Sequence, residues 1–182
     1  VVGYQALNLY QNTTGVHYDN AVLGYEALKL DNNTTGGGYQ NVAVGAQAMR
    51  LNNNTTGTIR YNTALGYQAL GLPNTTNENV TYNVAVGYQA LSCQSNSWNL
   101  SASNYNTAVG ANVLDANTTG DENTGLGVSA LGVNTTGCYN SAYGRDALCA
   151  NTTANSSTAV GVSALKANTT GAQNTAVGAS AL

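Results

Sequence analysis

Apolar and polar residues alternate around a glycine that returns at a regular spacing along the chain. The clearest copies are Asn-Val-Ala-Val-Gly-Tyr-Gln-Ala-Leu at 83–91 and Asn-Thr-Ala-Val-Gly-Ala-Ser-Ala-Leu at 174–182. The residue before the glycine is apolar, with Tyr143 as the oddity; the third residue after it is Ala, or Val113 once, and the fourth is Leu or Met49. The anchoring glycines are Gly3, Gly24, Gly45, Gly66, Gly87, Gly110, Gly127, Gly144, Gly161 and Gly178.

The spacing of these glycines predicts the fold. It is 21 residues in the first part of the chain, 23 once and 17 thereafter. A unit this short cannot bury a core alone and has to stack on its neighbours, whereas helical repeats need about 33 residues or more. Beyond the Leu anchor, apolar residues flank a more polar one such as Lys29 or Arg50, which is the period-two pattern of a short strand. We therefore predict an all-β parallel β-solenoid of ten coils of 17–23 residues, one coil per repeat, each with two or three short strands and a bend at the glycine.

A change of period divides the chain. Residues 1–91 form a section of 21-residue coils, and residues 106–182 form a section of 17-residue coils. Between them, residues 92–105 lack the repeat and contain Trp98. We interpret this as an irregular insertion in one continuous rod, and the whole as a window of a longer chain.

Stacked coils place repeated residues above one another as ladders. Asparagine recurs four residues before the glycine, with Ser157 as the exception, and stacked amides can bond to each other and to backbone groups at a bend. Tyrosines form one file just after the glycine and another near the asparagines. The predicted structural ladder is Asn20, Asn41, Asn62, Asn83, Asn106, Asn123, Asn140 and Asn174.

The second repeated motif is Asn-Thr-Thr, usually followed by Gly, and each copy matches the N-glycosylation acceptor pattern. Two interpretations stay open: a bend made by Asn, Thr and Gly alone, or the same bend carrying a glycan on Asn or Thr. In the second, the tyrosine files could be platforms on which sugars lie flat. The candidate glycosylation sites are Asn12, Asn33, Asn54, Asn74, Asn117, Asn134, Asn151, Asn168, Thr14, Thr35, Thr56, Thr119, Thr136, Thr153 and Thr170.

Charge and candidate chemistry argue against an enzyme. Charged residues are 7% of the chain, compared with about 25% in typical globular proteins. The single His17 has no repeated acidic partner, and the acids lie at different phases of the repeat; Glu26 and Asp146 share a phase but lie far apart. We predict no catalytic residues, no metal site and no cofactor. There is no basic stripe for nucleic acid, and no apolar run long enough for membrane insertion.

Three cysteines add a weak signal. Cys93 takes the position that holds Leu9, Leu30 or Val133 in other units, so we expect a small buried hydrophobe. Cys138 and Cys149 lie at less regular phases, and a disulfide between them is left open because sequence does not supply the geometry.

The motifs Asn-Thr-Ala-Val-Gly-x-x-Ala-Leu and Asn-Thr-Thr-Gly resemble the tandem repeats of bacterial surface or tail-fibre-like proteins and of glycan-coated extracellular fibrils. More distantly, they are similar to the β-roll heads of trimeric autotransporter adhesins. The resemblance implies an extracellular or cell-surface location and a structural role in matrix or adhesion.

We expect a fibre subunit whose partners are copies of itself, stacked end to end or side by side, and covalently attached glycans. The alternatives are a glycan-binding tail-fibre or adhesin shaft, an ice-binding solenoid, and a solenoid polysaccharide lyase or hydrolase. The last would need a carboxylate cluster on one face.

Overall fold

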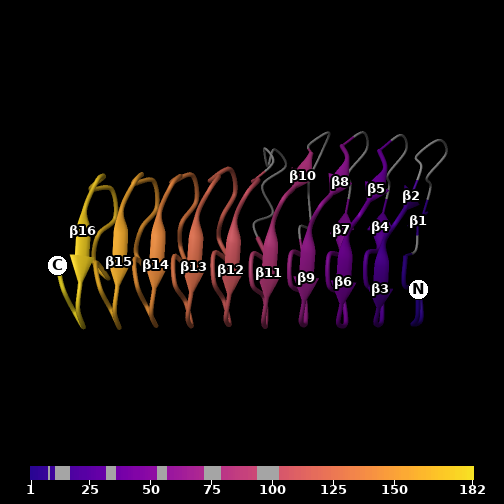
Figure 1. The fold of residues 1–182 in the computed structure, drawn as a ribbon, viewed down its shortest axis with the longest axis horizontal. Coiled ribbons are helices and arrows are strands. Elements are labelled where there is room, and N and C mark those ends of the chain that lie inside the picture. The colour runs from indigo at the N-terminus through magenta and orange to yellow at the C-terminus, as the bar shows by residue number, and fades with distance from the viewer. Residues whose placement is uncertain (8, 11–16, 32–35, 53–56, 72–78, 94–102) are drawn as a thin grey trace.

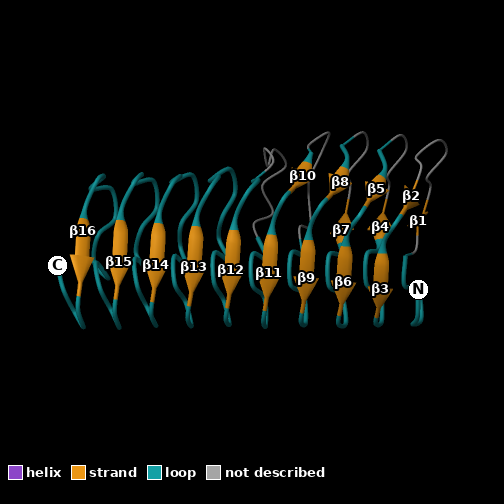
Figure 2. Ribbon diagram, viewed as in Figure 1, coloured by secondary structure: helices purple, strands orange, loops and turns teal. Residues whose placement is uncertain are grey.

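The chain winds into a rod of stacked coils, shown from the side in Figure 1. The structure is a computed structural model, and it describes residues 1–7, 9–10, 17–31, 36–52, 57–71, 79–93 and 103–182. Every strand pairing in this part of the chain is parallel, and none of the described residues is helical (Figure 2). The predicted all-β parallel β-solenoid is therefore confirmed.

Three parallel sheets run along the rod. The longest has nine strands in the order β16-β15-β14-β13-β12-β11-β9-β6-β3. The other two are β1-β4-β7 and β10-β8-β5-β2. The strands are β1 (Leu9–Tyr10), β2 (His17–Tyr18), β3 (Ala21–Leu23), β4 (Leu30–Asp31), β5 (Gly38–Tyr39), β6 (Val42–Val44), β7 (Leu51–Asn52), β8 (Ile59–Arg60), β9 (Thr63–Leu65), β10 (Val80–Thr81), β11 (Val84–Val86), β12 (Thr107–Val109), β13 (Thr124–Leu126), β14 (Ser141–Tyr143), β15 (Thr158–Val160) and β16 (Thr175–Val177).

The nine-stranded sheet keeps one register throughout. Each strand occupies the three residues before an anchoring glycine, and equivalent residues pair, as in Ala142 with Ala159. The ten predicted coils do not all contribute a strand: nine do, and the first contributes only the bridge Val2–Leu23. Across the predicted insertion 92–105, of which 94–102 lie outside the described residues, β11 still pairs in register with β12.

The two short sheets belong to the 21-residue section. The segment after the Leu anchor is a strand in β1, β4 and β7, as its alternation predicts. The prediction of two or three strands per coil is wrong for the 17-residue coils, because the equivalent residues there, such as 116–117, form no strand and leave one strand per coil. Figure 2 shows these additional strands in the first section beside the nine-stranded sheet.

The core is a column of small side chains capped by a column of large ones. In each strand of the nine-stranded sheet the middle residue points inward; it is Ala in most coils, as in Ala85 and Ala159. The Ala three residues after the glycine and the Leu that follows it are also buried, as Ala130 and Leu131 show. Cys93 is buried as predicted, at 1% exposure.

The bend after the glycine alternates between two backbone conformations. The second and fourth residues after the glycine have positive φ, for example Glu26 at 52° and Leu28 at 47°. This conformation points the amides of these two residues toward opposite ends of the rod. The Glu26 amide donates to Tyr4 O in the previous coil, and the Leu28 amide donates to Ala48 O in the next. Although a left-handed residue costs about 1–2 kcal/mol, here its amide stays hydrogen-bonded.

Two departures from the repeat, Val113 and Gly125, compensate each other in the core. Val113 replaces the alanine found at this position in the other coils, and Gly125 in the next coil replaces the inward alanine of the strand. A Cβ on Gly125 would overlap the Val113 Cγ1 methyl group. The pair keeps the core filled, because the larger side chain occupies the space that the missing methyl leaves.

This pairing predicts strong energetic coupling. Gly125→Ala alone should destabilise the rod by about 1–3 kcal/mol through overpacking, and Val113→Ala alone by about 2 kcal/mol through the cavity it leaves. The double variant restores the arrangement of the other coils and should be close to the wild type. Urea unfolding of all four proteins measures the coupling, and strictly additive losses would contradict this account.

Candidate functional site: the Asn-Thr-Thr bends

The asparagines that precede each strand form a hydrogen-bonded ladder through the rod. Asn123 Oδ1 accepts from the Asn140 backbone amide at 3.0 Å and from Asn140 Nδ2 at 3.2 Å. Asn123 Nδ2 donates to Gly137 O at 2.8 Å. Each side chain therefore fixes the next coil and satisfies a carbonyl at the bend. Buried members are Asn41, Asn62, Asn83, Asn106, Asn123 and Asn140; Asn20 and Asn174 lie at the two ends and are half-buried.

The asparagine of the Asn-Thr-Thr motif also points inward. Asn117, Asn134 and Asn151 are buried, at 0–1% exposure. Asn134 Nδ2 donates to Asn117 Oδ1, and Asn151 Nδ2 donates to Asn134 Oδ1, both at 2.8 Å. In the last coil, Asn168 is half-buried and its Nδ2 donates to Gly171 O. These amides form a second ladder inside the bend.

The first threonine of the motif locks one coil to the next. Thr135 O accepts three hydrogen bonds from the preceding coil: from Thr118 N at 2.9 Å, Thr118 Oγ1 at 2.8 Å and Thr119 N at 3.1 Å. Thr152 O accepts the same set from Thr135 and Thr136. The sequence analysis did not single out Thr118, Thr135 or Thr152 as functional. Their recurrence directly after the asparagine was the available signal.

The second threonine is the residue that the bend leaves accessible. Thr136, Thr153 and Thr170 are exposed, and Thr119 is half-buried. The candidates Asn12, Asn33, Asn54, Asn74, Thr14, Thr35 and Thr56 lie outside the described residues.

Because the asparagines of the motif are buried and the second threonines are mostly exposed, the two kinds of glycosylation candidate are not equivalent. A sugar on Nδ2 of Asn117, Asn134 or Asn151 has no room in the folded coil, because each nitrogen is buried and already donates a hydrogen bond. The positions that can carry a substituent without disturbing the ladders are the second threonines.

Several tyrosine rings stack on the equivalent ring of the next coil. Tyr61, Tyr82 and Tyr105 stack on one another, with centroids 4.8 and 4.9 Å apart. Tyr18 and Tyr39 belong to a separate pair at 4.7 Å, one position earlier in the repeat. Because each ring covers its neighbour, a stack exposes edges and hydroxyls rather than flat platforms for sugars.

The cysteines carry no bridge. Cys138 and Cys149 are free thiols, so the open question of their disulfide is answered in the negative in this structure. Cys138 Sγ instead accepts a hydrogen bond from the Asp121 amide of the previous coil, at 3.3 Å. In the same way, Asn155 Oδ1 of the next coil accepts a hydrogen bond from the Cys138 amide. Burial and the neighbouring Asp146 charge raise the pKa of the Cys149 thiol.

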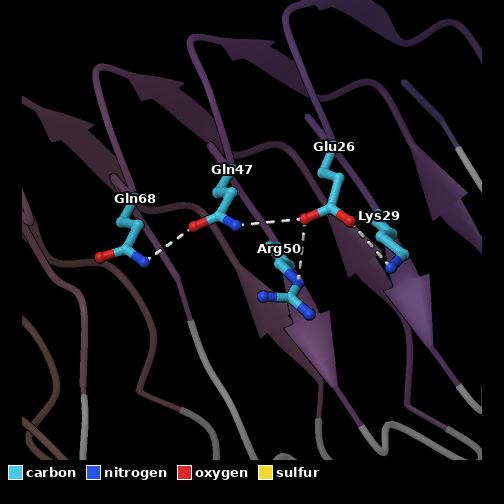
Figure 3. Close-up of polar contacts among 5 residues, drawn as sticks. All are labelled: Glu26, Lys29, Gln47, Arg50 and Gln68. Atoms are coloured by element: carbon cyan, nitrogen blue, oxygen red, sulfur yellow. Dashed lines mark hydrogen bonds and ion pairs between the residues drawn. The ribbon is translucent and has the colours of Figure 1, made fainter. Parts of the chain in front are cut away.

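One acidic residue lies in a polar cluster. Glu26 is buried, and its carboxylate accepts from Lys29 Nζ and Gln47 Nε2, both at 3.1 Å, with Arg50 Nε 3.8 Å away (Figure 3). Gln68 donates to Gln47, as Figure 3 shows, so Glu26 is the terminal acceptor of an amide ladder. Burial alone would raise the pKa of Glu26, but the hydrogen bonds from Lys29 and Gln47 and the Arg50 charge lower it overall.

Two other carboxylates of the described residues, those of Asp115 and Asp146, have separate partners. Asp115 accepts from Asn112 Nδ2 at 3.2 Å, and burial raises the pKa of its carboxyl. Asp146 pairs with Lys166 at 3.3 Å on another part of the rod. Within the described residues no group of three potential metal ligands comes together. No helix in that part of the chain could cross a membrane.

Comparison of the chain with protein-family models, with curated proteins and with solved structures gives no match. Function is therefore argued from the geometry of the bends and the stacking of the coils.

The Glu26 cluster predicts a loss of stability in acid. Because the folded-state pKa lies below the ordinary value of 4.5, the stabilisation is present at neutral pH and is lost as the pH falls through the folded-state pKa. Glu26→Gln extends the amide ladder and should cost about 1 kcal/mol at neutral pH while flattening the acid limb of stability against pH. Urea unfolding from neutral to acid pH measures both effects.

The matched control is Glu122→Gln, which alters an exposed carboxyl outside the cluster. It should leave the acid limb as in the wild type. An acid limb that is equally steep in the wild type and in Glu26→Gln would contradict the role assigned to Glu26.

Proposed function

We propose that this chain is a structural subunit of an extracellular or cell-surface β-solenoid fibre that serves matrix or adhesion, and that it carries glycans on the Asn-Thr-Thr bends. One observation carries the proposal: the repeated residues are used to join each coil to the next. Asn123 and Thr135 bond across coils, and the glycine row lets the backbones approach. A sequence in which most repeated positions serve stacking fits a fibre better than a catalyst.

Continuation of the stack is the expected mode of self-association. Bonds between coils recur along the rod, as in the Thr118 and Thr135 amides that donate to Thr135 O and Thr152 O of the following coils. The same ladder bonds would form whether the next coil belongs to the same chain or to another copy stacked end to end.

The outward threonines support the glycan part of the proposal. Thr136 and Thr153 recur once per coil, so their hydroxyls form a row with the spacing of parallel strands, about 4.8 Å. Attached sugars would keep rods with a net charge of only −3 soluble. The sugars would extend from the bend without displacing the buried asparagines.

The alternative binding roles have weaker support. A glycan-binding shaft loses its sugar platforms because the tyrosine rings stack on each other. The observation that favours ice binding is a row of outward pairs of threonine and an apolar residue on the sheet, such as Thr158 with Val160. The bulky Tyr143 in the same row interrupts the flat array that ice binding requires. A lyase or hydrolase would need carboxylates on one face, whereas Glu26 and Asp146 have separate partners.

Peptide-level mass spectrometry of native material tests the glycan assignment. We expect added sugar mass on peptides that contain Thr136, Thr153 or Thr170, and fragmentation that places the sugar on the second threonine of each motif. Asn117, Asn134 and Asn151 should be unmodified. Unmodified threonines in every copy, or sugar on those three asparagines, would contradict the assignment. Electron microscopy of the same material should show unbranched rods.

A further inference from the structure

The outer face of the nine-stranded sheet is uncharged along its whole length. In each strand the first and third residues point outward while the middle one is buried, as the exposed–buried–exposed pattern of β3 shows. The outward third residues form a row of Leu, Val and one Tyr. Members of this row include Leu23, Leu65, Leu126, Tyr143, Val160 and Val177.

These side chains are exposed although they are large and apolar. Leu65 and Leu126 are both 46% exposed, and Val177 is 71% exposed. The outward first residues add Val42 and Val84 in the first section and threonine in most later coils. None of the residues in either row is buried.

A third exposed row borders these two, directly after the glycines. It contains Tyr4, Tyr25, Tyr67, Tyr88, Val128 and Val162, all exposed. Across the three rows the only charged residue is Arg145, whose Nε lies 3.9 Å from the neighbouring Asp146 carboxylate. An uncharged strip of this kind is unusual, since exposed sheets normally carry charges that prevent association.

The area of this strip can be compared with the area that protein interfaces bury. Nine strands about 4.8 Å apart give a length of roughly 40 Å, and the three extended residues of each strand before the bend at the glycine give a width of roughly 10 Å. Each rod therefore offers a footprint of roughly 400 Å², and two such faces in contact would bury roughly 800 Å², which is the size of a weak protein interface.

We propose that this strip, named here the sheet face and defined by the three rows above, is the surface on which a second copy of the chain packs side by side. The match between the two faces is intrinsic, because both repeat at the same strand spacing and both lack charge apart from Arg145. The inference deepens the proposed fibre role by assigning its lateral contact. It does not depend on stacking between coil ends.

Sedimentation velocity of the 182-residue chain over a range of concentrations tests the proposal. The face variant is Leu126→Lys with Val160→Lys, which places two charges on outward positions and leaves the core unaltered. The control is Thr136→Lys with Thr153→Lys, which adds the same charge at exposed bend positions. Circular dichroism checks that both variants fold. We expect the wild type and the control to self-associate, and the face variant to associate at least tenfold more weakly.

Small-angle scattering separates lateral pairs from end-to-end stacks. A lateral pair keeps nearly the maximum dimension of one rod, whereas an end-to-end pair doubles it. A wild type that stays monomeric, equal weakening in both variants, or only doubled rods that the face variant still forms would each overturn the proposal. The last outcome would leave the fibre role intact. Thermal hysteresis that the face variant abolishes, without self-association of the wild type, would assign the face to ice.

Discussion

Successive coils approach closely at the anchoring glycines, and the rest of the rod depends on this contact. A Cβ placed on Gly127 would lie 2.7 Å from the carbonyl carbon of Gly144 in the next coil, a distance that backbone atoms do not allow. The φ of Gly127 is also positive, at 126°. Because both requirements recur in each coil that another coil covers, the glycine fixes the register, and the register places every other ladder.

With the register fixed, packed core side chains and hydrogen-bonded ladders stabilise the stack of coils. The core combines columns of alanine with a column of buried Leu and Met anchors, and its stability comes from the repetition and close packing of these small and large side chains. Buried asparagines such as Asn123 would be costly alone, but each amide finds partners in the adjacent coil. The outside of the rod is then free for two separate uses: accessible hydroxyls at the bends and an apolar face on the sheet.

The sequence predicted the architecture because the glycine period is too short for helical repeats and too regular for a globular domain. The burial of the Leu anchors and of Cys93 followed from their place in the repeat. The details that failed have a physical reason. Residues such as Glu26 and Leu28 adopt positive φ that nothing in their side chains favours, because hydrogen bonds to both neighbouring coils impose it. The loss of the second strand in the 17-residue coils follows from the shorter circuit.

The candidate site was predictable only in outline. The repetition of Asn-Thr-Thr marked the bends, but the motif does not say which of its side chains points inward. The structure divides the roles, with Asn134 in the ladder, Thr135 in the contact between coils and Thr136 exposed. The tyrosine files were recognisable as repeats, yet only the geometry shows that rings such as Tyr82 and Tyr105 cover one another.

The most direct test of the glycine constraint compares Gly127→Ala with Gly178→Ala by urea unfolding. Both glycines have φ near 130°, but within residues 1–182 a Cβ on Gly178 meets only Ala181 Cβ, at 3.9 Å. Gly178→Ala should therefore cost only the backbone strain, about 1–3 kcal/mol, and Gly127→Ala should cost several kcal/mol more or prevent folding. Equal losses in the two variants would contradict the claim that close approach between coils organises the rod.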